Sequence, residues 1–109
     1  MIQPGEVYLV DLGFAGKYRL MVVLSRRDDS APRALAVCAP ITTSRRGGQY
    51  EVEVGRVPFL SADSCINVQG IQAVQHHELK RRIGSLPEAA LAASKAALVF
   101  MFDLEESDN

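Results

Sequence analysis

The sequence contains no long hydrophobic run and no internal repeat. No apolar stretch approaches the roughly 20 residues that a membrane-spanning helix needs. The segment Met1 to Gly5 has neither the basic nor the apolar region of a signal peptide. We therefore expect a cytoplasmic protein with no membrane partner.

Cysteine is also scarce. Cys38 and Cys65 are the only two, and both lie in apolar, strand-like stretches. Such positions favour buried free thiols over a disulfide. No histidine pattern accompanies the two cysteines, so they do not predict a zinc site. We expect no metal, no cofactor and no cysteine-dependent chemistry.

A strong excess of basic residues is missing as well. The 109 residues include 12 Lys or Arg and 13 Asp or Glu, and the formal net charge is −1. Four of the acidic residues follow Phe102, and no basic residue occurs there. Residues 1–102 therefore carry 13 − 4 = 9 acidic and 12 basic groups, a net charge of about +3. This charge permits a nucleic-acid partner without requiring one. A chain of this length buries one modest core, so we expect one domain over residues 1–109, with 103–109 a frayed acidic tail.

Short strand-like segments separated by turns make up most of the chain. Leu20 to Leu24 is an unbroken apolar run, typical of a buried strand. The loop 13–17 is short enough to join two antiparallel strands. Many short strands with frequent turns predict a small barrel or sandwich. The predicted strands are residues 6–11, 17–25, 33–41, 49–54, 64–68 and 71–74.

One helix is predicted at the end of the chain, over residues 87–102. Ser85 and Glu88 have the spacing of a capping box, in which the serine oxygen accepts a backbone N–H at the helix start. Leu91, Leu98 and Phe102 fall on one stripe, which we expect to lie on the barrel. Further apolar side chains around Phe100 indicate a subunit or partner interface.

Arg19 stands at the start of the buried strand. A guanidinium offers a planar fork of donors that stays protonated, which suits it to binding a phosphodiester. The alternative is that Arg19 only begins the strand and pairs with an acid on the surface. This residue alone does not decide between the two.

Several segments taken in order resemble the MazF/PemK family of toxin endoribonucleases, also called mRNA interferases. The match runs in register over nearly the whole chain. It comprises Pro4 to Leu12, Arg19 with Val22 to Ser25, Ile41 to Thr43, Asp63 to Gln69, Ile71, Val74, Leu79 and Ile83 to Leu86.

The resemblance implies a mainly β fold with a C-terminal helix, namely a small SH3-like β-barrel of the MazF/PemK/CcdB type. It also implies a homodimer that cleaves single-stranded RNA without a metal and is inhibited by a cognate antitoxin peptide. The family's catalytic arginine and threonine fall on Arg19 and Thr42.

Such a pair suits RNA cleavage by the substrate's own 2′-hydroxyl. This reaction needs the nucleophile and the leaving oxygen in line across phosphorus, with fixed donors for the charge that develops. We expect Arg19 to clamp and stabilise the phosphate and Thr42 to assist. The resemblance implies products with a 2′,3′-cyclic phosphate and a 5′-hydroxyl.

Polar side chains near these two residues are candidates for binding the RNA. We expect Lys17, Arg45, Arg46 and Gln69 to line the approach, because phosphate contacts supply most of the affinity for RNA. Solvated loop charge is the alternative for the basic members. His76 and His77 form a weaker hypothesis for proton transfer, because adjacent residues of an extended chain point apart and a polar surface turn explains both.

The first loop differs from the family pattern. No carboxylate lies between Asp11 and Asp28, and Leu20 follows Arg19 where the family has proline. A second hypothesis therefore stays open, in which the same barrel is a non-catalytic regulator that binds RNA or protein, or a gyrase-type target poison.

Overall fold

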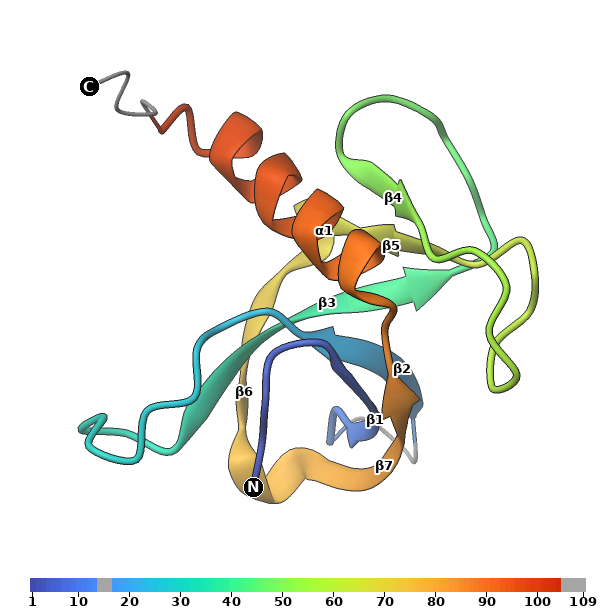
Figure 1. Ribbon diagram of the computed structural model, residues 1–109. Helices are drawn as coiled ribbons and strands as arrows, with labels where there is room; N and C mark the ends of the chain where they lie inside the picture. Colours follow the sequence, from blue (N-terminus) through green and yellow to red (C-terminus); the bar gives the residue numbers. More distant parts are fainter. Residues whose placement is uncertain (14–16, 105–109) are drawn as a thin grey trace.

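Figure 1 shows the computed structural model, in which a curled antiparallel sheet carries one helix across it. The structure describes residues 1–13 and 17–104. Their elements are β1 (Glu6–Asp11), β2 (Tyr18–Val23), β3 (Leu35–Thr42), β4 (Glu51–Glu53), β5 (Cys65–Asn67), η1 (Val68–Gly70), β6 (Gln72–Gln75), η2 (His76–Glu78), β7 (Leu79–Ser85) and α1 (Glu88–Met101). The predicted mainly β fold with one C-terminal helix is confirmed.

Strand β3 is the centre of the sheet. The strand order is β4-β5-β3-β2-β1-β7, and β6 also pairs with β3. One edge of β3 pairs with β2, while the other pairs first with β6 and then with β5. The end of β3 at Thr42 therefore lies between β2 and β5.

The buried strand predicted around Leu20 to Leu24 is β2, and both of its faces are covered. Met21 and Val23 pack in one apolar cluster and Val22 packs in another, and none of the three side chains is more than 2% exposed. A strand buried on both faces loses the alternation of polar and apolar residues, which accounts for its continuous apolar sequence.

The sequence predicts no strand at residues 79–85, yet β7 pairs there with β1. Lys80, Arg81 and Arg82 are exposed, and the pairing with β1 shifts register twice along its length. A run of three charges with irregular pairing hides the period-2 pattern by which a strand is recognised.

Helix α1 is confirmed within one residue at each end, but the predicted capping box is wrong. Ser85 belongs to β7, and its hydroxyl accepts a hydrogen bond from Arg82 Nη2 (2.7 Å) instead of from the helix start. Leu91 and Leu98 pack on the core as predicted. Phe102 does not, because the helix ends before it and its side chain is 55% exposed.

No helix in the described part of the chain is long and apolar enough to cross a membrane. Of the predicted acidic tail, residues 105–109 lie outside the described residues, while Asp103 and Leu104 are exposed.

The two cysteines are free and buried, as predicted. Burial raises the pKa of Cys38 to about 12 and also raises the pKa of Cys65. Because the thiolate is the reactive form, we expect neither thiol to react with Ellman's reagent in the native protein at pH 8. Both should react once guanidinium unfolds the chain, and rapid reaction of a native thiol would contradict the packing.

Candidate functional site

Arg19 and Thr42 lie at the adjoining ends of the neighbouring strands β2 and β3. The pairing of the two strands ends at Met21 and Pro40, and the same antiparallel register carried two residues further would set Arg19 across from Thr42. Directly opposite residues of an antiparallel pair point to the same face of the sheet. The two side chains therefore converge at the ends of β2 and β3.

Both side chains line one open depression with a volume of about 350 Å³. We call it the Arg19 depression. Its walls come from the ends of β2 and β3, the loop between β3 and β4, and the β5–η1 segment. The lining residues are Arg19, Pro40, Thr42, Ser44, Arg46, Gly47, Tyr50, Glu51, Asn67 and Gln69.

The hydroxyl of Thr42 is held by its own loop. Its Oγ1 accepts a hydrogen bond from the Ser44 backbone N–H at 3.0 Å. Because a hydroxyl has one donor besides its acceptor lone pairs, the Thr42 hydrogen is left to donate to a ligand. Arg19 is exposed, and none of the ion pairs within the described residues involves it.

Glu51 shapes the loop between β3 and β4. Its carboxylate accepts hydrogen bonds from the backbone N–H groups of Arg46 (3.0 Å) and Gly47 (2.7 Å). Gly47 and Gly48 follow with φ of +83° and +96°, a conformation that side chains other than glycine rarely adopt. The carboxylate thus fixes the turn that places Arg46 on the depression.

Four of the six residues predicted for the site lie together: Arg19, Thr42, Arg46 and Gln69. Arg45 lies elsewhere, because its guanidinium forms an ion pair with Glu53 and donates from Nε to the Asp63 carbonyl at 3.2 Å. Lys17 is exposed two residues before Arg19 but does not line the depression.

The depression also contains residues that sequence reasoning missed, notably Ser44, Tyr50, Glu51 and Asn67. Tyr50 stacks at an angle on Phe100 of α1, with ring centroids 5.5 Å apart. The Asn67 side chain accepts the Gln69 N–H at 3.1 Å and so holds Gln69 in η1. Asn67 could have been identified from the sequence, because it lies in the same strand–turn segment as Gln69. Glu51 could not, because its sequence context is that of an ordinary exposed strand residue.

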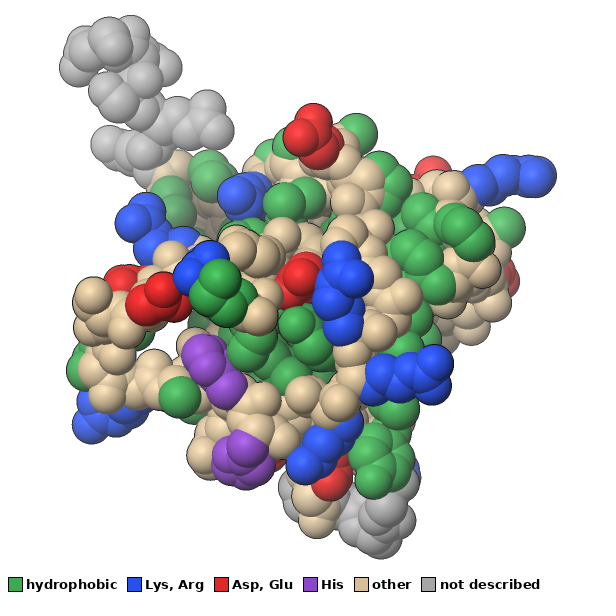
Figure 2. Space-filling view, turned by 60° about the horizontal axis from the view of Figure 1, so that its bottom comes forward, with side chains coloured by type: hydrophobic (Ala, Val, Ile, Leu, Met, Phe, Trp, Pro, Cys, Tyr) green, Lys and Arg blue, Asp and Glu red, His purple; other side chains and the backbone are tan. Residues whose placement is uncertain are grey.

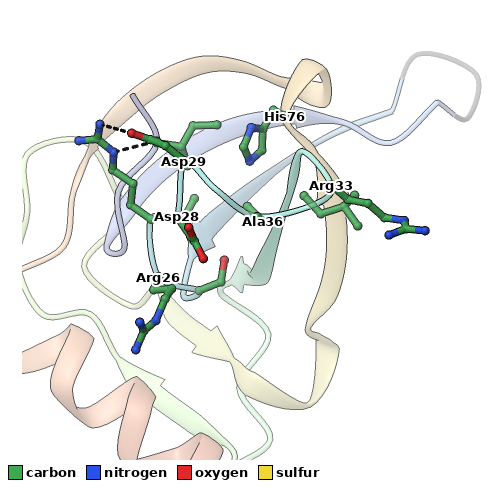
Figure 3. Close-up of a pocket in the computed structure, with 12 residues that line it drawn as sticks. Arg26, Asp28, Asp29, Arg33, Ala36 and His76 are labelled. Carbon is green, nitrogen blue, oxygen red and sulfur yellow. Dashed lines mark hydrogen bonds and ion pairs between the residues drawn. The ribbon is translucent and has the colours of Figure 1, made fainter.

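The two histidines do not line the Arg19 depression. His76 borders a different, small cavity of about 60 Å³ beneath the loop between β2 and β3, shown in Figure 3. Arg26 and Arg33 point outward from that cavity, and Arg27 is paired with Asp29 at 2.9 Å. In Figure 2 the two histidine side chains appear as separate purple patches among scattered blue Lys and Arg side chains.

No group of three or more His, Cys, Asp or Glu side chains in residues 1–13 and 17–104 is arranged to hold a metal ion. The chemistry available in the Arg19 depression is that of two guanidinium groups, hydroxyls, amides and the Glu51 carboxylate, which is bound to the backbone N–H groups of Arg46 and Gly47. The guanidinium, hydroxyl and amide donors match the oxygens of a phosphodiester.

Comparison with protein families gives a match over residues 3–102 to a family described as PemK-like, MazF-like toxin of type II toxin-antitoxin system. No curated protein matches the sequence.

Several solved structures share the fold. An endoribonuclease from a Mycobacterial species, solved in complex with its cognate antitoxin, is 23% identical, with 98% of this chain and 100% of that chain covered and a TM-score of 0.84. The Mycobacterium tuberculosis toxin MazF-mt6 is 29% identical, with 93% and 99% covered and a TM-score of 0.78. A chain of the MazE–MazF complex from Deinococcus radiodurans is 17% identical, with 94% and 96% covered and a TM-score of 0.79.

Proposed function

Because the chain belongs to the PemK-like, MazF-like toxin family of type II toxin-antitoxin systems, we propose that it is a metal-independent endoribonuclease that cleaves single-stranded RNA at the Arg19 depression. The observation that carries this proposal is that Arg19 and Thr42, at the ends of two neighbouring strands, line one open hollow. The endoribonucleases among the structural relatives support it.

The proposed reaction is an in-line displacement at phosphorus. The substrate 2′-oxygen forms a bond to phosphorus and loses its proton, while the bond to the 5′-oxygen breaks and that oxygen gains a proton. The products are a 2′,3′-cyclic phosphate and a 5′-hydroxyl. Arg19 meets the charge on the non-bridging oxygens, and Thr42 donates its free hydroxyl hydrogen to the same phosphate.

Cleavage of single-stranded RNA by the purified protein in excess EDTA tests the proposal. We expect the intact protein to cut and to leave 2′,3′-cyclic phosphate ends. Thr42→Val, which keeps the shape and removes the hydroxyl, should cut much more slowly, whereas Thr42→Ser should retain most activity. Absence of cleavage by the intact protein, or full activity in both Arg19→Ala and Thr42→Val, would contradict the proposal.

Neighbouring arginines offer a matched test of the RNA path. Arg46 lines the depression, whereas the guanidinium of Arg45 is bound to Glu53 and Asp63. We expect Arg46→Ala to raise KM by roughly three- to tenfold and to lower the salt dependence of binding by about 0.7 in log–log slope, the loss of one phosphate contact. Arg45→Ala should leave both quantities near wild type, and equal effects of the two changes would contradict the assignment.

Lys17 and Gln69 complete the proposed RNA contacts. Gln69 is exposed on the depression, where its amide can contact sugar or base edges. Lys17 is exposed just before β2 and is proposed to meet a phosphate beyond the depression.

We also propose a homodimer and inhibition by a cognate antitoxin peptide. Phe100, Phe102 and Leu104 are 48%, 55% and 58% exposed at the end of α1, which leaves a sizeable apolar surface for a partner. One structural relative is described as bound to its cognate antitoxin. Light scattering on the purified protein measures the oligomeric state directly.

A further inference from the structure

A second hollow borders the Arg19 depression at Thr42, which lines both. We call it the Leu20 hollow. Its volume is about 430 Å³, and it is lined by Leu20, Ile41, Thr42, Thr43, Phe59, Leu60, Ser61 and Ser64.

The strands explain why the two hollows adjoin. Leu20 follows Arg19 on β2, and Ile41 precedes Thr42 on β3. The Leu20 hollow therefore adjoins the Arg19 depression at the strand ends, and Thr42 lies between the two. A ligand with one group at the Arg19–Thr42 pair can therefore place its neighbouring group in the Leu20 hollow.

Part of the wall of the Leu20 hollow is apolar and held in place. Leu20, Phe59 and Leu60 are all half-buried, and the last two pack on the main core. The Phe59 ring lies directly on β7 at Gly84, where an added Cβ would be only 2.6 Å from ring atom Cε1. A ring held this closely against backbone gives a fixed apolar surface.

Hydroxyl groups also line this hollow. Ser64 is 3% exposed, and its backbone N–H is bound to the Ser61 carbonyl at 3.0 Å, which fixes the segment that carries both serines. A hydroxyl both donates and accepts hydrogen bonds, so the serine and threonine side chains of the hollow suit a ligand with a hydrogen-bonding edge.

We propose that the Leu20 hollow binds the nucleobase next to the scissile phosphate and contributes to the choice of cut site. The inference rests on the proposed function, because the phosphate is placed by Arg19 and Thr42. A nucleobase has a flat apolar face and a polar edge. These match the apolar side chains and the hydroxyl groups that line the hollow. Bases of single-stranded RNA are recognised by stacking combined with hydrogen bonds to their edges.

Filling the hollow tests this assignment. Ser61 is exposed at its rim, whereas the adjacent Ala62 is also exposed but does not line it. We expect Ser61→Trp to lower kcat/KM on a randomised single-stranded RNA by roughly tenfold and to change the base frequencies beside the cut, read by sequencing the fragment ends. Ala62→Trp should leave both unchanged.

Ser64→Ala provides the second variant, because it removes only a hydroxyl group from the lining of the hollow. We expect it to alter the base frequencies at the cut with little change in thermal stability. Base frequencies equal to wild type in both Ser61→Trp and Ser64→Ala would overturn the nucleobase assignment while leaving the proposed cleavage intact.

A binding measurement separates this inference from the failure of cleavage itself. A 2′-O-methyl RNA pool with one 4-thiouridine per strand lacks the 2′-hydroxyl nucleophile and reports only where bases contact the protein. We expect ultraviolet crosslinks within residues 59–64 that Ser61→Trp reduces and Ala62→Trp does not. Crosslinks confined to other segments would overturn the inference, even if the intact protein cuts RNA.

Discussion

Replacing Arg19 with alanine is expected to slow RNA cleavage by roughly 100- to 1000-fold, the usual effect of removing one preorganised donor to a developing anion. The side chains of Arg19 and Thr42 both line the Arg19 depression. Single-turnover cleavage with enzyme in excess measures the rate of the chemical step directly.

Arg19→Lys separates the contribution of the planar guanidinium donors from that of the positive charge. Lysine keeps the positive charge but lacks the planar pair of donors that binds two phosphate oxygens at once. We therefore expect Arg19→Lys to restore RNA binding more completely than the cleavage rate. Full recovery of the rate would show that charge suffices.

The control for Arg19 is another exposed arginine near the same strand. Arg26 follows the far end of β2 and does not line the Arg19 depression. Arg26→Ala should cut RNA at the wild-type rate. Because Arg19 is exposed and outside the ion pairs of the described residues, Arg19→Ala should also unfold at the wild-type temperature. A cleavage rate within twofold of wild type for Arg19→Ala would contradict its role.

The largest loss of stability is expected from Ile66→Ala. Ile66 is 0% exposed and pairs with Ile41 of β3 on one side and with Val52 of β4 on the other. Removing its buried methyl groups leaves a cavity where two strand pairs meet, and changes of this kind cost about 2–5 kcal/mol in the free energy of unfolding. The expected fall in Tm is roughly 10–20 °C.

Thermal and urea unfolding followed by circular dichroism measure this effect. Ile66→Val removes a single methyl group and should cost only about 0.5–1.5 kcal/mol. Leu35→Ala offers a matched change at an aliphatic residue that is 42% exposed, and it should lower Tm far less. Similar losses for Ile66→Ala and Leu35→Ala would show that Ile66 is not a core residue.

The fold follows closely from the sequence where burial produces a simple pattern. The apolar run of β2 and the helical stripe of Leu91 and Leu98 correspond to observed elements, because burial selects residues at regular spacing. Strand β7 was missed because its exposed charges interrupt that spacing. The capping box failed because Ser85 belongs to the strand, and local spacing does not reveal which element holds a residue.

The candidate site divides in the same way. The sequence indicates Arg19 by its place at the start of a buried strand, the family resemblance implies the catalytic roles of Arg19 and Thr42, and residue type and position indicate Arg46 and Gln69. Arg45 was predicted on the same grounds as Arg46, but its guanidinium lies outside the depression in an ion pair with Glu53. Glu53 belongs to β4, a strand that comes later in the chain, so the sequence around Arg45 does not reveal this ion pair. Neighbouring residues with the same charge cannot be told apart without the packing around them.

By itself, the sequence determined most of the elements, the family and the residue types available to hold a phosphate, because these depend on local composition and order. Only the tertiary structure decided that Arg19 and Thr42 share one depression, that Glu51 holds the loop carrying Arg46, and that Ser64 lines a hollow beside them. These relations come from strand register and from contacts between distant segments, and a one-residue change of register would turn each side chain to the other face.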